Sequence, residues 1–377
     1  MADLNLTEIT LTQLSMTLDV HMKTKHSFML HGAPGVGKSQ IIKDWCKEKG
    51  YTLVTRMLSQ MQPSDFIIPH VDRENNITRW ALADWLAELP TDHPCVLFFD
   101  ELPAAPHDVQ ISAYQILLDR EIAGNKLPED CLVVAAGNRC SDGAIASEMG
   151  TAAADRLTHF NITVRAEEWL EWANKVEIHP YVQAFIKTNP HELLDEDNHE
   201  DLVRVSPRSW KVVSDYLYEA HKQGLSNGVI QSLLEGRIGN THTATFLQVM
   251  KDIKNLHPVK DYIKALRKDK KKLIDMTPEK TTTAYGLMFS MLSQASKAQD
   301  YIDLMMCFYY FRQAKDKNVN YEEIFVSACT LCYKPIKDND YNYDLITSPE
   351  FGYYLCDVIT DVPAFQDLKK DLEEMNS

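Results

Sequence analysis

The sequence predicts an α/β fold in which helices cover both faces of a parallel β-sheet, followed by an all-α region. Three observations lead to this prediction. In the first 165 residues, short apolar runs alternate with helical patterns, which is typical of parallel sheets. A glycine-rich stretch joins the first apolar run to a helix. From about residue 166 the strand pattern gives way to long helical patterns.

The predicted elements follow one another in the order that such a sheet requires. Residues 11–22 repeat apolar side chains at helical spacing, and "HSFMLHG" then forms a short buried strand. After the glycine-rich turn we expect a helix over residues 40–49. The later strands are the runs "YTLVTRML", "CVLFFD", "CLVVAAGN" and "HFNITV", and the run "HDVQISAYQILLD" forms a helix between the second and third of them.

A hairpin interrupts this order within residues 64–86, "SDFIIPHVDRENNITRWALADWL". Apolar and β-branched residues stand on both sides of a charged turn, residues 72–76, and a helical pattern follows. The pattern predicts a hairpin from Ile67 to Thr78. Two isolated strands are only marginally stable in water. We therefore expect a partner or a neighbouring subunit to cover the hairpin; an ordinary surface excursion is the alternative.

The chain is acidic, with a formal net charge of -15 at pH 7 over 377 residues. Because phosphate binding relies on clustered Lys and Arg, this charge disfavours broad affinity for nucleic acids. Residues 259–273, "VKDYIKALRKDKKKL", are a local exception on a predicted helix. Such a run forms either a solvated face or a contact for a polyanion or an acidic partner.

The cysteines and the apolar runs bear on the expected compartment. The 8 cysteines are scattered, without the dense framework of a small secreted domain, so we expect reduced thiols. Cys329 and Cys332 form the one CxxC; in a helical pattern they are core thiols, with a metal or redox site as the alternative. The first 30 residues lack the pattern of a signal peptide, and no apolar run reaches the roughly 18 residues of a membrane span. We expect a cytoplasmic protein.

"GAPGVGKS", residues 32–39, has the spacing of a phosphate-binding loop and stands between a predicted strand and a predicted helix. Glycines let the backbone amides converge on phosphate oxygens, and the helix N-terminus adds partial positive charge. We expect Lys38 to contact the β- and γ-phosphates and Ser39 to bind Mg²⁺; a glycine-rich turn with a stray lysine is the alternative. The predicted nucleotide-binding residues are Gly32, Ala33, Pro34, Gly35, Val36, Gly37, Lys38, Ser39 and Gln40.

Two acids end the buried strand "VLFFDE". Asp100 lies at the carboxyl end of the strand, where sheets of this class place groups that contact ligands. We expect Asp100 to hold Mg²⁺ and its water shell, and Glu101 to act as the general base on the attacking water. Adjacent acids at this position could instead cap the next helix.

Asn138 ends a second strand, "VVAAGN", in the same way. Its uncharged amide can orient the attacking water or contact the γ-phosphate. A polar residue at a strand end is often only a turn former, but the parallel with "VLFFDE" favours a role in catalysis.

Together and in this order, the motifs resemble those of AAA+ ATPases. The segments "GAPGVGKS", "PSDF", "VLFFDELPAAP", "ILLDREI", "VVAAGN", "AAADRL" and "SPRSW" follow with the approximate spacing of the MoxR-like branch, over residues 5–225. The resemblance implies a P-loop AAA+ core with a β-hairpin inserted in its second helix, facing the pore of a ring. The chain departs from the family at His70, where a glycine is common, and at the charged tip of the hairpin.

The resemblance also assigns two arginines. Arg156 in "TAAADRL" is similar to the finger that reaches into a neighbour's nucleotide site, although the family commonly reads LDRF where this chain reads ADRL. Arg208 in "SPRSW" is similar to the lid arginine that senses the γ-phosphate. Each could otherwise form an ordinary surface ion pair. Arg139, beside Asn138, is a second candidate for the contact in trans.

With this resemblance, the expected domains are an AAA+ α/β nucleotide-binding core over residues 1–165, a helical lid over residues 166–240, and an all-α C-terminal domain over residues 241–377. A turn near "EGRIGNTHT", residues 235–243, marks the start of the last domain. That domain has no counterpart in the family, and we expect it to dock a partner.

The function expected from the resemblance is that of a Mg²⁺-dependent ATPase that assembles as a homo-oligomeric ring, most often a hexamer. MoxR-like ATPases assemble, activate or remodel other proteins, often with a partner that bears a von Willebrand factor A domain, so a chaperone-like remodeller is implied. One alternative is a nucleic-acid motor or restriction-type NTPase that uses the Lys-rich helix; another is a slow nucleotide-switched binding module. The expected catalytic residues are Lys38, Glu101, Asn138 and Arg156, and the metal ligands are Ser39 and Asp100.

Overall fold

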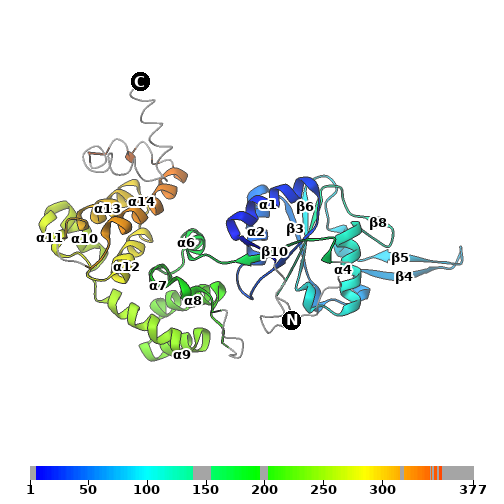
Figure 1. Cartoon of the computed structure of the whole chain (residues 1–377), viewed down its shortest axis with the longest axis horizontal. Helices are drawn as coiled ribbons and strands as arrows, with labels where there is room; N and C mark the ends of the chain where they lie inside the picture. Colours follow the sequence, from blue (N-terminus) through cyan, green and yellow to red (C-terminus); the bar gives the residue numbers. More distant parts are fainter. Residues whose placement is uncertain are drawn as a thin grey trace, which may run out of the picture. The chain divides into compact units, whose positions relative to one another are not determined.

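The computed structural model describes residues 6–138, 154–195, 203–314, 318–339, 341, 344–345 and 348–349. Arg139 lies outside these residues. The chain divides into two compact units (Figure 1). The first contains Met1–Glu168 and Leu194–Ser209, and the second contains Trp169–Leu193 and Trp210–Ser377.

The first unit is built on a six-stranded sheet with the strand order β1-β10-β2-β9-β6-β3. All neighbouring strands in it run parallel, as the alternation of strands and helices predicted. The strands are β1 (Thr7–Thr10), β2 (Phe28–His31), β3 (Thr52–Met57), β6 (Cys95–Asp100), β9 (Cys131–Gly137) and β10 (Thr158–Thr163). The edge strand β1 was not anticipated, because its sequence, TEIT, has no apolar run of the kind that marks β2.

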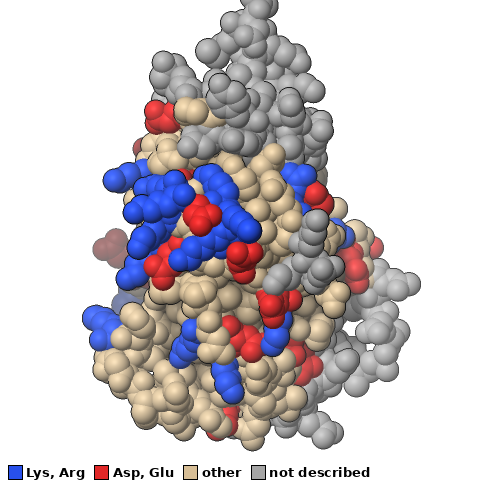
Figure 2. Space-filling model, turned by 90° about the vertical axis from the view of Figure 1, so that its left-hand side faces the viewer, with Lys and Arg blue, Asp and Glu red and all other residues tan. Residues whose placement is uncertain are grey.

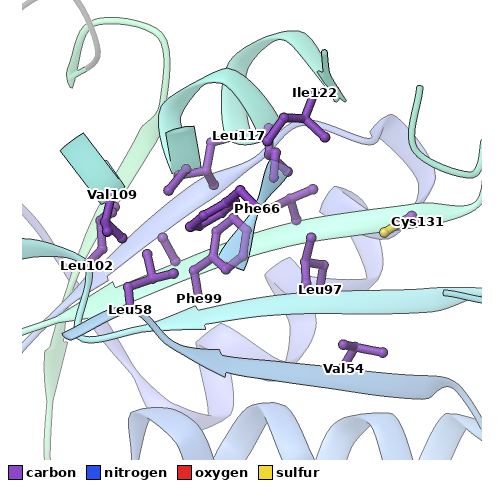
Figure 3. Packing of buried hydrophobic residues seen from close by; sticks show 14 of the residues in the cluster. Val54, Leu58, Phe66, Leu97, Phe99, Leu102, Val109, Leu117, Ile122 and Cys131 are labelled. Carbon is purple, nitrogen blue, oxygen red and sulfur yellow. The ribbon is translucent and has the colours of Figure 1, made fainter. Parts of the chain in front are cut away.

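Helices cover both faces of this sheet, and the alternation of side chains along the strands assigns each residue to one face. On β6, Val96 and Phe98 pack with α1 (Leu11–Thr24) and α2 (Lys38–Lys49). Leu97 and Phe99 point to the opposite face, where α4 (His107–Asp119) covers them (Figure 3). These two layers of buried side chains hold the carboxyl ends of β2, β6 and β9 at one edge of the sheet.

The predicted hairpin is confirmed and is longer than expected. Its strands β4 (Ile67–Asp72) and β5 (Ile77–Leu82) pair antiparallel, with Ile67 opposite Leu82 and Asp72 opposite Ile77. The flanking helical segments are short: the 3₁₀ turns η1 (Leu58–Gln60) and η2 (Pro63–Asp65) precede the hairpin, and α3 (Asp84–Ala87) follows it.

Two aromatic residues fix the base of the hairpin in the core. Phe66 and Trp85 flank its two strands, are buried, and meet edge to face with ring centroids 5.7 Å apart. The Trp85 indole N–H donates to the Asp65 carbonyl over 2.7 Å. Phe66 also packs on Phe99 of the sheet (Figure 3). The base is therefore anchored, while large apolar side chains on the strands, such as Trp80 with 50% of its surface exposed, are not covered.

The first unit has three smaller elements. The 3₁₀ turn η3 (Leu102–Ala104) links β6 to α4. A second, two-residue hairpin joins β7 (Glu121–Ile122) to β8 (Asn125–Lys126) and was not predicted from the sequence. Its turn places Ala123 and Gly124 at positive φ.

The second unit consists of helices in the residues described. They are α7 (Pro180–Thr188), η5 (Pro190–Leu193), α9 (Asn227–Lys254), α10 (Val259–Lys268), α11 (Lys270–Asp275), α12 (Thr281–Leu292), α13 (Ala298–Phe311) and α14 (Tyr321–Asp338), together with most of α6 (Ala166–Lys175) and of α8 (Pro207–Gln223). Within α9 the backbone leaves helical geometry at Gly239, with φ 74° and ψ 169°. This break falls inside the segment in which the sequence predicted a turn.

The CxxC of α14 is part of this helical core. Cys329 and Cys332 are fully buried, and burial raises the pKa of both thiols above the usual range. The prediction of core thiols is confirmed, and the described residues contain no cluster of three or more metal-binding side chains. Among the same residues, no helix combines the length and apolarity that crossing a bilayer requires.

Candidate functional site

The phosphate loop joins β2 to α2, as the sequence predicted. Gly35 and Gly37 have φ values of 80° and 107°, a region that disfavours side chains. At Gly35 a close neighbour adds to this restriction, because a Cβ built there would lie 2.6 Å from Ser206 Oγ. Only glycine fits this position, and the loop keeps its backbone amides at the N-terminus of α2.

Lys38 is the first side chain of the site. It is 7% exposed, and its ammonium group donates to the carbonyls of Gly32 (2.7 Å) and Ala33 (3.1 Å) and to Asn138 Oδ1 (3.0 Å). An ammonium group has three N–H donors, and these three acceptors match them. Donation to a phosphate oxygen therefore requires Lys38 to exchange at least one of these bonds.

Ser39 and Asp100 meet directly, as two shared ligands of one cation would. The Ser39 hydroxyl donates to Asp100 Oδ2 over 2.5 Å. A hydroxyl and a carboxylate are the hard oxygen donors that Mg²⁺ prefers, and Mg²⁺ takes its remaining ligands from water and substrate phosphates. The pair fits the predicted Mg²⁺ site, in which water and phosphate oxygens would fill the other coordination positions.

Glu101 follows Asp100 and is held by a residue that the sequence analysis missed. Ser59, in η1, donates its hydroxyl hydrogen to Glu101 Oε2. Glu101 itself has a φ of 58°, and its backbone N–H donates to Asp100 Oδ1 over 3.0 Å. The only signal for Ser59 is the register that pairs Met57 with Asp100, since the residues after each strand then share one edge of the sheet.

A close approach of two segments places Asn138 at the same edge. Gly137 ends β9 against Pro103 of η3, and a Cβ at Gly137 would lie 2.2 Å from Pro103 Cδ. The glycine lets β9 lie directly against the turn that follows Asp100 and Glu101. Asn138 then accepts a hydrogen bond from Lys38 through its side-chain Oδ1.

The segment that carries Arg208 packs against the phosphate loop within the first unit. The Arg208 backbone N–H donates to the Gly35 carbonyl over 3.3 Å. Ser206 beside it is buried and bonded to Ser209, whereas the Arg208 side chain is exposed. The structure thus brings Arg208 to the loop that should hold the phosphates.

Arg156 and Gln40 are placed differently. Arg156 is exposed on the turn before β10, and no bond joins it to the other predicted site residues that the structure describes. Gln40 is exposed on α2, and its side-chain amide donates to Asp44 over 2.8 Å. The roles assigned to Arg156, Arg208 and Gln40 remain predictions.

Comparisons with known proteins agree with this geometry. Residues 28–157 match the family described as "ATPase family associated with various cellular activities (AAA)". No curated protein matches the chain.

Several solved structures are similar to the chain at low identity. One is the RuvB Holliday junction branch migration motor of Thermotoga maritima, with 16% identity and a TM-score of 0.34 over 68% of this chain and 74% of that one. Another is a provisionally assigned ATPase from Cytophaga hutchinsonii, with 13% identity and a TM-score of 0.29 over 83% of this chain and 78% of that one.

The matched family segment contains the phosphate loop, the Ser39 and Asp100 pair, Glu101 and Asn138, and it ends just after Arg156. Residues 28–157 therefore form an AAA ATPase domain, and the reaction of the chain is ATP hydrolysis.

Proposed function

We propose that the chain is a ring-forming, Mg²⁺-dependent ATPase of the MoxR-like branch, which uses ATP hydrolysis to remodel, assemble or activate a partner protein. The observation that carries the proposal is the meeting of Lys38, Ser39, Asp100 and Asn138 at one edge of the sheet. Six subunits in a closed ring and a cytoplasmic location are part of the same proposal.

In this mechanism each side chain has one task. Lys38 exchanges a loop carbonyl for a phosphate oxygen, while Ser39 and Asp100 hold Mg²⁺, which when bound offsets the charge of the phosphates. Glu101 leaves Ser59 and accepts a proton from the attacking water, which Asn138 orients. Arg208 approaches the γ-phosphate from the segment beside Gly35.

Arg156 completes the site of the neighbouring subunit. Its side chain is exposed, as a contact with another subunit requires. Arginine fingers of this kind contribute roughly 10³- to 10⁵-fold to turnover. Arg156→Ala should therefore abolish hydrolysis in the ring, and mixing with Lys38→Ala subunits, which retain Arg156, should restore part of it. If Arg156→Ala retains full turnover, the residue is structural.

The proposed partner is a protein, and the hairpin supports this. It exposes four large apolar side chains on a two-stranded element: Ile68, Val71, Ile77 and Trp80. Because side chains alternate along a strand, the register places Val71 and Trp80 on one face of the hairpin and Ile68 and Ile77 on the other. A protein that covers either face would bury two of these side chains. We further propose that residues 166–240 act as a lid, and that residues 241–377 dock the partner, for which a von Willebrand factor A domain protein is the candidate.

A second candidate, a nucleic-acid motor, is favoured by one observation. Basic side chains gather on the surface of α10 and α11 (Figure 2). The exposed basic residues there are Lys260, Lys264, Arg267, Lys268, Lys270, Lys271 and Lys272. Acidic side chains lie among them, and Arg267 is paired with Asp303 over 2.5 Å. DNA that stimulates ATPase activity, with an affinity that falls steeply with salt, would favour this candidate over protein remodelling.

The decisive experiment traps the ATP-loaded form. Glu101→Gln should retain ATP binding and lose turnover, so its complex with a partner should persist. Affinity capture with ATP, followed by mass spectrometry, should recover a protein that Lys38→Ala, the matched control without phosphate binding, does not retain. A recovered set that is identical for both variants contradicts the proposal. Wild-type turnover far below that of ordinary ATPases would instead support a nucleotide switch.

A further inference from the structure

Two histidines connect the phosphate loop with the turn that carries Arg156. His31 ends β2 directly before Gly32, and His159 lies on the neighbouring strand β10. The rings stack with centroids 5.2 Å apart and an interplanar angle of 30°, and His31 Nε2 lies 2.9 Å from His159 Nδ1. Both side chains belong to the first unit.

His159 also forms a hydrogen bond, through its second ring nitrogen, to the turn that carries Arg156. His159 Nε2 lies 2.8 Å from the Ala154 carbonyl, and the Leu157 N–H donates to the same carbonyl over 3.2 Å. Asp155 and Arg156 stand between these two bonded residues. The turn that presents Arg156 is therefore closed by two hydrogen bonds to one oxygen, and one of them comes from a side chain.

The acceptor fixes the tautomers. A carbonyl oxygen can only accept, so His159 Nε2 carries the hydrogen, and Nδ1 of the neutral ring is an acceptor. His31 Nε2 must then donate to it. The result is a directed chain of bonds from His31 through His159 to Ala154.

At its His31 end, this series of hydrogen bonds is adjacent to the phosphate loop. The carbonyl of Gly32, the residue after His31, accepts from Lys38 over 2.7 Å. Lys38 must give up at least one acceptor to reach a phosphate oxygen, and two of the acceptors described are carbonyls of the loop directly after His31. Phosphate binding can therefore act on the backbone beside His31.

We propose that His31 and His159 are positioning residues that join each subunit's phosphate loop to its own Arg156 turn, and so set this arginine for the neighbouring subunit's site. The proposal rests on the trans role of Arg156 given above. The histidines do not touch the reacting atoms. A defect in them appears in the neighbour's turnover and leaves the subunit's own ATP binding intact.

Two substitutions of His159 separate its two bonds. His159→Gln keeps a donor at the position of Nε2 and so retains the bond to Ala154. His159→Asn keeps an acceptor at the position of Nδ1 and loses the bond to Ala154. Since a misplacement of about 1 Å can cost about 100-fold in rate, His159→Asn should lower kcat roughly 10- to 100-fold with KM for ATP unchanged. His159→Gln, which keeps the bond to Ala154 but loses the acceptor for His31, should show only a small loss, of about threefold.

Mixing subunits tests where the defect acts. His159→Asn subunits mixed in equal amounts with Lys38→Ala subunits receive an intact Arg156 turn from half of their neighbours. Their turnover should rise to about half of that in a wild-type and Lys38→Ala mixture, or more, which is the reference for any inhibition by inactive subunits. A defect in the subunit's own phosphate loop gives no such rise.

A second readout does not depend on turnover. Trypsin cuts after arginine, and opening of the turn exposes the bond that follows Arg156. His159→Asn should be cut there several-fold faster than wild type or His159→Gln, as measured by mass spectrometry of the fragments. His31→Leu, which removes the donor and leaves the Ala154 bond, should show a smaller loss of kcat that mixing also repairs.

The outcomes are distinct. Unchanged kcat in His159→Asn, a loss that mixing does not repair, or an equal loss in His159→Gln each overturns the proposal. If His159→Asn does not assemble, His31→Leu carries the test, and full activity there overturns the link to the phosphate loop. If mixing with Lys38→Ala subunits does not restore turnover to Arg156→Ala subunits, the proposed role of Arg156 in the neighbouring subunit's site is wrong.

Discussion

Ser59 donates a hydrogen bond to Glu101, the residue proposed as the general base. The bond fixes the carboxylate toward η1, and the backbone of Glu101, with a φ of 58°, lies in a region that is rarely occupied by residues other than glycine. A hydrogen bond to a charged group contributes about 1.5–3 kcal/mol. The bond occupies only Oε2, but a turn of the carboxylate away from η1 toward an attacking water would break it.

Removal of this bond should raise basal turnover. Ser59→Ala frees Glu101 from its hydroxyl partner, so we expect kcat to rise by up to ~10-fold, with KM for ATP unchanged. Ser59→Thr keeps the hydroxyl and is the matched control, with turnover near wild type. Steady-state ATPase assays on both variants check this. A lower kcat in Ser59→Ala would show that Ser59 orients Glu101 for the reaction instead of restraining it.

Asn138 should affect rate and binding in separable ways. Asn138→Ala removes one acceptor of Lys38 and the amide that orients water, so kcat should fall roughly 10- to 100-fold with little change in ATP affinity. Asn138→Asp places a carboxylate beside Lys38 and the γ-phosphate site, so it should weaken ATP binding as well. Titration with a fluorescent ATP analogue and single-turnover assays measure the two effects. Equal losses of affinity in both variants would contradict this role.

The sequence identified the residues whose position depends on one strand and its following turn. The phosphate loop, Asp100, Glu101 and Asn138 each stand at the end of a buried strand, and a parallel sheet brings such ends to one edge. In the structure Lys38 donates to Asn138, and Ser39 donates to Asp100. The local sequence pattern was sufficient to identify these residues, because the pairing of parallel strands brings their carboxyl ends together.

Contacts that depend on register or on the return of the chain were not predictable. Ser59 lies beside Glu101 only because β3 pairs with β6 in one register, and no local pattern specifies it. Ser206 reaches Gly35 after a long excursion of the chain; the sequence marks it as part of "SPRSW" but does not show that its hydroxyl meets the phosphate loop. Short strands without an apolar run, such as β1 (TEIT) and β7 (EI), leave no recognisable pattern.

The close approach of Ser206 to Gly35 gives a stability prediction. Gly50→Ala isolates backbone strain, because Gly50 has a φ of 71° and no atom within 4 Å of its missing Cβ, and it should cost about 1 kcal/mol. Gly35→Ala adds the contact with Ser206 Oγ, so it should cost more and weaken ATP binding. Adding Ser206→Ala should recover part of both losses. Urea unfolding and calorimetric ATP titration check this; equal costs for Gly35→Ala and Gly50→Ala would contradict it.

His179 should make the second unit less stable in acid. It is the N-cap of α7, where Nδ1 accepts from the Tyr181 N–H over 3.2 Å and the ring lies 4.8 Å from that of Tyr218. Burial, with smaller effects from His221 and Lys254, lowers the pKa of His179 from 6.5 to about 4. Between these two values the unfolded chain binds more protons than the folded one. The free energy of unfolding therefore falls as the pH falls from 6.5 to 4, by roughly 3 kcal/mol in all.

His179→Asn tests this titration with the cap preserved. Asparagine is a strong N-cap residue, and its side-chain oxygen can accept from the Tyr181 N–H, but it carries no proton to gain in this range. We expect the variant to lose stability at pH 7, because the ring contacts are gone, and to show a flatter dependence of its unfolding midpoint on pH between 7 and 4.5. Urea unfolding across this range measures both curves. Since the wild-type contribution is fully present above pH 6.5, the two curves should converge toward pH 4.5, and parallel curves would assign the acid sensitivity to other groups.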